Sequence, residues 1–228
     1  MVYVGYKNSL IAQNTLQNLV EKTNTYYREW NLSINHYKCE IIIYFHPPLR
    51  FISPHRRIPI KNLRILYRDK DTDITHEIQR KYVVNYLEIF LNYLLKFNIH
   101  ILTQLEKSSN SFKGYHRSFL NKNIEAWAKV ILYLTLICPI FTYAAPIWWS
   151  FSASMAEKLC KFERSCLRVA LNKFRTPESE FTQYHSNETL YNLAQIPRID
   201  LFIIQFTREY IANTKDSSNA IVKSFAIQ

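Results

Sequence analysis

The chain has 228 residues, of which 48% are hydrophobic and 15% aromatic, so it holds enough apolar material for one large or two small folded domains. Lysine and arginine number 29 against 18 aspartate and glutamate residues, and the resulting net charge of +11 favours a polyanionic partner, either nucleic acid or an acidic membrane surface. The 2 glycines, Gly5 and Gly114, are too few for a P-loop or a glycine-rich dinucleotide turn, which excludes nucleotide binding by those routes.

The cysteines and the N-terminus indicate where the protein resides. Cys39, Cys138, Cys160 and Cys166 form no C-x-x-C pair and have no histidine at zinc spacing, so we expect reduced thiols. The N-terminal stretch carries no long apolar segment of the kind found in secretory signals. We therefore expect an intracellular protein, in the nucleus or the cytoplasm.

An uncharged stretch, residues 130–156, is long enough to pass a crude test for a membrane-spanning helix. Pro139 and Pro146 interrupt it, and several serines and threonines dilute its apolar character. Basic residues lie on both sides of it as well. The sequence therefore predicts a buried helix followed by a loop, and no membrane partner.

The sequence predicts one helix and several short strands over residues 1–100. Apolar residues at helical spacing predict an amphipathic helix over 13–30, with Leu16, Leu19, Val20, Tyr27 and Trp30 on its buried face. The β-branched and aromatic run at 39–45 predicts a strand. Alternating apolar residues and turn residues over 50–81 predict further short strands.

Helical periodicity takes over after about residue 95, which suggests a domain boundary near Ile101 and a mainly helical second half. The expected helix faces run through Phe119, Ile124, Trp127, Val130, Ile131 and Leu134, and then through Met155, Leu159, Phe162, Cys166, Val169 and Ala170. A last helix is expected over 199–212. The fold class predicted from these patterns is α+β.

Several segments, in order along the chain, match short polymerase motifs. WNLSINHYKCEIIIYF (30–45) is similar to W-x-L-x-I-N-x-x-K-(T/C) with a following strand, and YLEIFLNYLLKFNIHI (86–101) is similar to YLG-(I/V)-x-LD-x-x-L-x-(F/W)-x-x-HI. Later matches are YLTLICPIFTYAAPIW (133–148), KLCKFERSCLRVALN (158–172) and LYNLAQIPRIDLFI (190–203). Together these segments resemble the C-terminal part of a reverse transcriptase of non-LTR retrotransposons, the jockey-like or LINE-like mobile elements.

The resemblance implies an α+β fold in two parts. Residues 1–100 would be the late part of the polymerase palm, with a remnant of motif C, motif D and the primer grip, built from short antiparallel strands and one helix. Residues 101–228 would be the helical thumb and the C-terminal region. The upstream palm and fingers of such a polymerase would precede Met1, so the missing N-terminal part of the polymerase is one expected partner.

The sequence departs from the family at its catalytic centre. Tyr6 and Lys7 stand where the resemblance places the paired aspartates that hold two Mg²⁺ ions, and neither side chain is a ligand for a hard divalent cation. Glu88 replaces a turn glycine, and Asn92 replaces an aspartate. We therefore expect a degenerate fragment of an RNA-directed DNA polymerase that does not polymerise DNA alone and holds no cofactor.

The resemblance also assigns roles to residues of motif D and the primer grip. The resemblance places Lys38 at the motif D lysine, beside the incoming nucleotide, and Tyr86 and Leu87 in the primer grip. A solvated lysine before an edge strand is the alternative interpretation of Lys38.

Basic residues indicate a second function class, a non-enzymatic module that binds an RNA/DNA hybrid or another nucleic acid through a thumb helix. A solvated polar helix face is the alternative. The candidate contacts are Lys158, Lys161, Arg164, Arg168, Lys173 and Arg175, together with Arg56, Arg57 and Arg64.

No metal site is expected. Asp69, Asp71 and Asp73 imitate the opening of a calcium loop, but Ile74 and Arg80 occupy the positions that need glycine and a bidentate glutamate.

Overall fold

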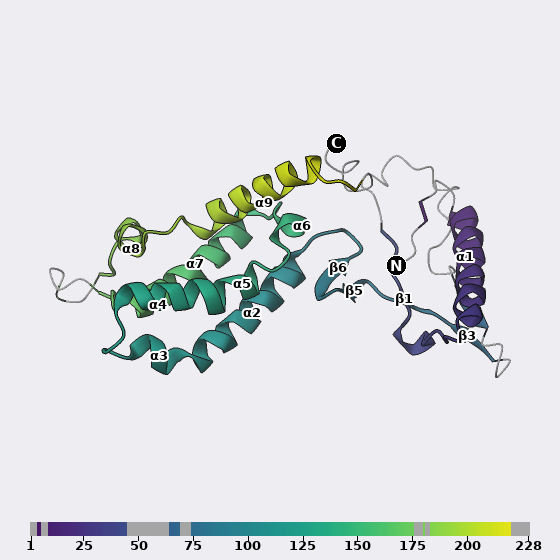
Figure 1. Ribbon diagram of the computed structural model, residues 1–228, viewed down its shortest axis with the longest axis horizontal. Helices are drawn as coiled ribbons and strands as arrows, with labels where there is room; N and C mark the ends of the chain where they lie inside the picture. The colour runs from purple at the N-terminus through teal and green to yellow at the C-terminus, as the bar shows by residue number, and fades with distance from the viewer. Residues whose placement is uncertain are drawn as a thin grey trace. The chain divides into compact units, whose positions relative to one another are not determined.

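The computed structural model describes residues 4–5, 9–44, 64–68, 74–175, 180 and 183–219 (Figure 1). The chain divides into two compact units, Met1–Lys96 and Phe97–Gln228. The first unit combines helix and short strands and the second is helical in its described part, so the prediction of an α+β protein is confirmed. The change in periodicity near residue 95 falls close to the division between the units.

The first unit contains one long helix and three pairs of short strands. The helix α1 spans Ser9–Glu29, and a 3-10 helix, η1, spans His36–Lys38. Strand β1 (Glu40–Ile41) pairs in parallel with β4 (Gln79–Arg80), and β2 (Leu66–Arg68) pairs antiparallel with β3 (Thr75–Glu77). Strands β5 (Val83–Tyr86) and β6 (Ile89–Asn92) form an antiparallel hairpin.

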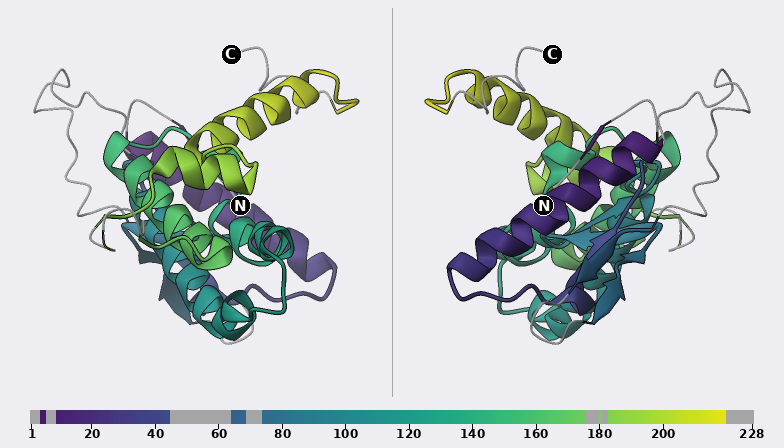
Figure 2. Two further views of the ribbon diagram at one scale, coloured as in Figure 1. Left: turned by 90° about the vertical axis from the view of Figure 1, so that its left-hand side faces the viewer. Right: turned by 90° about the vertical axis from the view of Figure 1, so that its right-hand side faces the viewer.

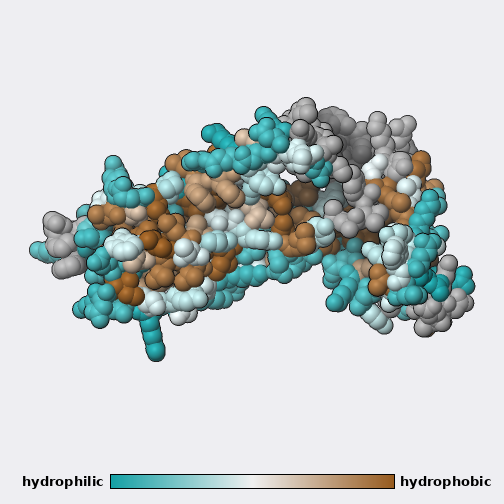
Figure 3. Space-filling view, in the orientation of Figure 1, coloured by the Kyte–Doolittle hydropathy of each residue, from teal (hydrophilic) through white to brown (hydrophobic). Residues whose placement is uncertain are grey.

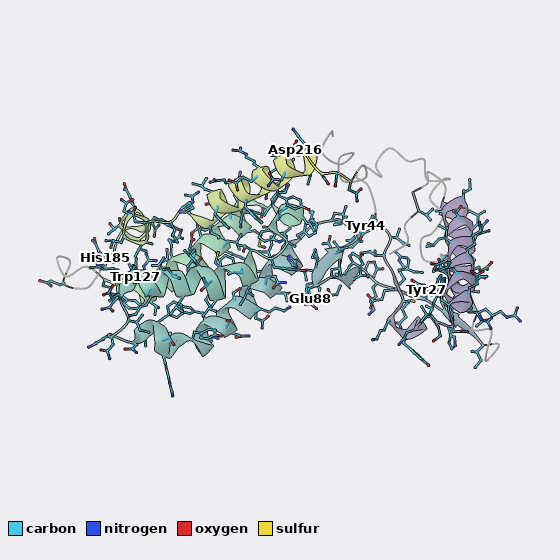
Figure 4. The ribbon with its side chains drawn as sticks, viewed as in Figure 1. Tyr27, Tyr44, Glu88, Trp127, His185 and Asp216 are labelled. Atoms are coloured by element: carbon cyan, nitrogen blue, oxygen red, sulfur yellow. The ribbon has the colours of Figure 1, made fainter. Side chains whose placement is uncertain are left out.

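Helix α1 packs on β2 through both apolar and amide side chains. Leu16 and Val20 contact a small core made by Ile65, Tyr67 and Ile78. Tyr27 and Trp30 are 39% and 65% exposed, so the predicted buried face is wrong over the last turns of the helix (Figure 4 labels Tyr27). The apolar residues keep their helical spacing there, but no described element packs against them.

Amide side chains of α1 take the place of a strand beside β2. The Nε2 of Gln17 donates to the carbonyl of Leu66 at 2.8 Å, and the amide of Leu66 donates back to the Oε1 of Gln17 at 2.9 Å. Gln13 Nε2 donates to the carbonyl of Arg64 at 2.9 Å. These bonds satisfy backbone groups that an edge strand would otherwise leave open.

The strand predicted over 39–45 is shorter than expected. Only Glu40–Ile41 is strand, and residues 42–44 have no regular structure. Phe45 lies outside the described residues. A strand extends only as far as its partner does, and β4 offers two residues.

The β5–β6 hairpin turns at Leu87 and Glu88, which have φ values of 50° and 62°. Positive φ at both central residues belongs to a type I′ turn, which matches the twist of the strands and favours asparagine and glycine. Glu88 marks the tip of the hairpin in Figure 4. Glu88, which stands where the resemblance implies a turn glycine, therefore has a left-handed backbone conformation.

The second unit is a group of helices packed around one core (Figures 1 and 2). Its helices are α2 (Asn98–Gly114), α3 (His116–Leu120), α4 (Ala126–Leu132), the π-helix η5 (Tyr133–Ile137), α5 (Cys138–Phe141), α6 (Ala145–Trp148), α7 (Ala153–Leu171), α8 (Asn187–Ala194) and α9 (Ile199–Lys215).

Helix α7 is central to this unit, since it contacts α2, α3, α4, η5, α8 and α9. Ser152 caps its N-terminus by accepting a hydrogen bond from the amide of Met155, and Asn172 ends it in a left-handed conformation with φ 54°. Its buried residues include Met155, Leu159, Cys166 and Ala170, as predicted.

The uncharged stretch 130–156 is divided among α4, η5, α5, α6 and the start of α7. In the described part of the chain, no helix combines the length and the apolar character needed to cross a membrane.

The helix face predicted from Phe119 to Leu134 is correct only in part. Phe119 and Val130 are buried, but three other members are exposed, Trp127 at 63%, Ile131 at 47% and Leu134 at 40%. Figure 3 shows hydrophobic residues on the surface of the helical unit. Tyr133 and Ile137, which were not on the predicted face, are buried. The buried residues Val130, Tyr133, Ile137 and Phe141 are themselves three or four residues apart, so a second stripe of helical spacing, beside the predicted one, faces the core.

Candidate nucleic-acid interface

The predicted basic face is only partly a helix face. Lys158, Lys161, Arg164 and Arg168 lie on α7, but the helix ends at Leu171. Lys173 and Arg175 therefore lie in the segment that follows the helix, which corrects the prediction that Arg175 belongs to the face. Lys158, Lys161 and Lys173 are exposed.

The chain returns to the end of α7 just before α8. Arg175 and Tyr184 form an isolated antiparallel bridge, and the amide of His185 donates to the carbonyl of Phe174 at 3.3 Å. Arg168 Nη2 lies 3.4 Å from the carbonyl of His185 and 3.3 Å from Asn187 Oδ1. These contacts attach the start of α8 to α7, at the end of the unit where Figure 4 labels His185.

A groove of about 450 Å³ lies between α7 and this returning segment. Three cationic side chains of α7 line it together with two aromatic rings and smaller residues. Its lining residues are Lys161, Arg164, Ser165, Arg168, Val169, Phe174, Tyr184 and Asn187.

The ring of Tyr184 is held by two guanidinium groups. The Cζ atoms of Arg168 and Arg175 lie 5.5 Å and 5.4 Å from its centroid. Such cation–π contacts contribute about 0.5–1 kcal/mol each at exposed sites. Tyr184 is nevertheless 60% exposed, so the ring is positioned without being covered.

The groove carries more positive charge than the described acidic residues compensate. Arg164 forms an ion pair with Glu157 at 2.7 Å, and among the described residues this is the one ion pair made by Lys161, Arg164 or Arg168. Burial and the neighbouring charge of Arg164 lower the pKa of Arg168. Two adjacent cations of this kind favour an anion between them.

A buried carboxylate lies one residue from Arg164. Glu163 is 1% exposed and accepts hydrogen bonds from the Tyr191 hydroxyl at 2.7 Å, the amide of Ile199 at 3.0 Å and the Tyr133 hydroxyl at 3.4 Å. Burial raises its pKa to about 7. Because Tyr191 belongs to α8, this cluster helps to hold the groove wall against α7.

The remaining candidate residues lie in the first unit. Lys38 is exposed at the end of η1, ahead of β1. Arg64 is exposed and forms an ion pair with Glu77 at 3.7 Å. Tyr86 and Leu87, at the tip of the β5–β6 hairpin, are 41% and 69% exposed.

Some predicted positions have no structural description. Tyr6, Lys7, Arg56 and Arg57 lie outside the described residues, as do Asp69, Asp71 and Asp73. Within the described residues, no cluster of three or more histidine, cysteine or acidic side chains has the geometry to hold a metal ion.

The sequence patterns did not single out Phe174, Tyr184, Asn187 or Glu163. The two rings and the amide lie in irregular chain or at a helix start, where no periodicity singles them out. Glu163 does have a local signal, since it is a charged residue on the otherwise apolar side of α7.

The fold and the groove define a basic α+β protein whose helical unit presents a groove that is both cationic and aromatic. Comparison of the chain with protein-family models, with curated proteins and with solved structures finds no match. The case for a function therefore depends on the groove and on the sequence motifs.

Proposed function

We propose that the helical unit binds nucleic acid through the groove between α7 and the segment before α8. The convergence of Lys161, Arg164 and Arg168 with two exposed aromatic rings carries this proposal. Cationic side chains neutralise phosphates, and aromatic rings stack on bases. The net charge of +11 attracts a polyanion toward the whole protein.

We further propose that the chain derives from the C-terminal part of a non-LTR reverse transcriptase and has lost polymerase activity. The ordered sequence motifs support the lineage, and so does the helical character of the second unit, where the resemblance implies a thumb. A phenol at Tyr6 and an ammonium at Lys7 do not fit a pair of Mg²⁺ ions, so no metal-assisted step is assigned to this chain.

The binding proposal is tested by measuring the affinity of the full chain for a labelled oligonucleotide over a series of salt concentrations. Each phosphate contact contributes about 0.7–0.9 to the slope of log affinity against log salt. We expect Lys161→Gln to reduce the slope by about that amount. Lys113→Gln, at an exposed lysine in the last turn of α2, changes the net charge equally and should leave the slope nearly unchanged.

An affinity that does not depend on salt, or equal slopes for the two variants, would contradict the proposal. Polymerase activity is tested separately by primer extension on an RNA template with Mg²⁺ or Mn²⁺. We expect no extension, and any extension would show that other carboxylates hold the metal ions.

A further inference from the structure

The geometry points to single-stranded nucleic acid as the ligand of the groove, with one unstacked base against Phe174 and Tyr184 and the neighbouring phosphates on the cations of α7. This inference rests on the proposed function and specifies its ligand. It predicts that the protein binds single strands more tightly than duplexes, and that an aromatic ring of the groove contributes to the affinity for single strands.

The cations form a row that leads to the aromatic end of the groove. Lys161, Arg164 and Arg168 are three or four residues apart, so they share one face of α7. At 1.5 Å per residue the row is roughly 10 Å long. The helix then ends, and Phe174 follows within the groove lining.

The aromatic rings distinguish the two kinds of ligand. A duplex keeps its bases paired and stacked inside and offers mainly phosphates to a basic helix, which needs no aromatic surface. An unpaired base has free faces that stack on aromatic side chains. Phe174 and Tyr184 are 42% and 60% exposed beside the cations, which suits an unpaired base.

The size of the groove agrees with a small ligand segment. The groove is open to solvent, and its volume of about 450 Å³ suits a nucleotide or two of a strand.

The groove is also organised before any ligand binds. Two guanidiniums position the Tyr184 ring, and backbone pairing at Arg175 and Phe174 fixes the segment that carries it. Arg168 keeps hydrogen-bonding capacity at its Nη2, because both contacts of that atom are long; its Nε also has no hydrogen-bond partner within the described residues, but that atom is buried. A preorganised site loses less conformational entropy on binding.

The test compares Phe174→Ala in the full chain with Phe206→Ala as a matched control. Both phenylalanines are about equally exposed, at 42% and 41%, but Phe206 lies on α9 and does not line the groove. The pairing at Phe174 uses backbone atoms, so the substitution retains it. The probes are a labelled single-stranded RNA and an RNA/DNA hybrid of the same length.

We expect the unmodified chain to bind the single strand more tightly than the hybrid. Phe174→Ala should weaken single-strand binding roughly 5- to 150-fold, the equivalent of about 1–3 kcal/mol for one stacked base. Hybrid binding should change little, and Phe206→Ala should change neither. A 2-aminopurine placed in the single strand should change its emission on binding the unmodified chain but less on binding Phe174→Ala.

The outcomes separate the two proposals. Salt-dependent binding that is equal for both probes and unaffected by Phe174→Ala would overturn the single-strand inference and leave nucleic-acid binding in place. An absence of salt-dependent binding to either probe would overturn both.

Discussion

Glu163 connects four elements through one carboxylate. It belongs to α7, and its hydrogen-bond donors come from η5, α8 and the first residue of α9. Beside it, Arg198 and Asp200 form a bidentate ion pair with both contacts at 2.6 Å, which lowers the pKa of Asp200. The carboxylate therefore organises the entry of α9 and the attachment of α8 together.

This carboxylate should make the stability of the helical unit depend on pH. Its pKa rises from an ordinary 4.5 to about 7 on folding, so the folded state binds the proton more tightly and the free energy of unfolding falls as pH rises through that window. At about 1.4 kcal/mol per pKa unit the decrease amounts to about 3 kcal/mol. Burial also raises the pKa values of Tyr133 and Tyr191, which keeps both phenols neutral throughout.

We expect Glu163→Gln to remove this pH dependence. The amide oxygen can accept from the amide of Ile199 and the hydroxyl of Tyr191, while its NH₂ group donates to the hydroxyl of Tyr133. Urea unfolding followed by circular dichroism from pH 5 to 8.5 measures the effect. Parallel profiles for the two proteins would contradict the assignment of the pH dependence to Glu163.

At the scale of single elements, the β5–β6 hairpin contains a local conflict between sequence and backbone. Leu87 and Glu88 adopt left-handed conformations that cost non-glycine residues about 1–2 kcal/mol each. We expect the double substitution Leu87→Asn with Glu88→Gly to slow hydrogen exchange of the β5 and β6 amides roughly 5- to 30-fold. That corresponds to a net gain of about 1–2 kcal/mol, because the greater freedom of glycine in the unfolded chain offsets part of the relieved strain.

Glu88→Gln is the control for this hairpin prediction, because it removes the charge and leaves the positive φ in place. Exchange in Glu88→Gln should match that of the unmodified chain. If Glu88→Gln slows exchange as much as the double substitution does, the charge of Glu88 and not its backbone conformation is the source of the strain.

The elements also show what periodicity can and cannot predict. The apolar side of α7 was predicted because the helix is regular from Ser152 to Asn172. The face through Ile131 and Leu134 was wrong because the core is lined by a neighbouring apolar stripe, Tyr133, Ile137 and Phe141, that has helical spacing as well. Both stripes are apolar, so periodicity alone does not decide which of them is buried.

Non-local contacts limited the prediction of the groove in the same way. The cations of α7 were visible as a helical pattern, whereas Tyr184 and Asn187 enter the groove only because the chain turns back to Arg168. The hydrogen bonds of Gln13 and Gln17 to β2 are a further example, since glutamine on a helix ordinarily indicates a solvated side.

At the scale of the whole molecule, the groove and the larger core belong to one unit. The core cluster that includes Tyr133, Trp148, Leu159 and Ile203 lies entirely within Phe97–Gln228, as do all residues that line the groove. The small core of Ile65, Tyr67 and Ile78 belongs to the other unit. A domain with its own core and its own site is expected to fold and bind separately.

We therefore expect a chain limited to residues 97–228 to unfold cooperatively and to keep nucleic-acid binding. Its slope of log affinity against log salt should equal that of the full chain, because the phosphate contacts are the same. Its absolute affinity should be lower if basic residues of the first unit add long-range attraction. A cooperatively folded 97–228 chain with a smaller slope would place some of the phosphate contacts in residues 1–96, and Arg64 with its neighbours would then be the next residues to substitute.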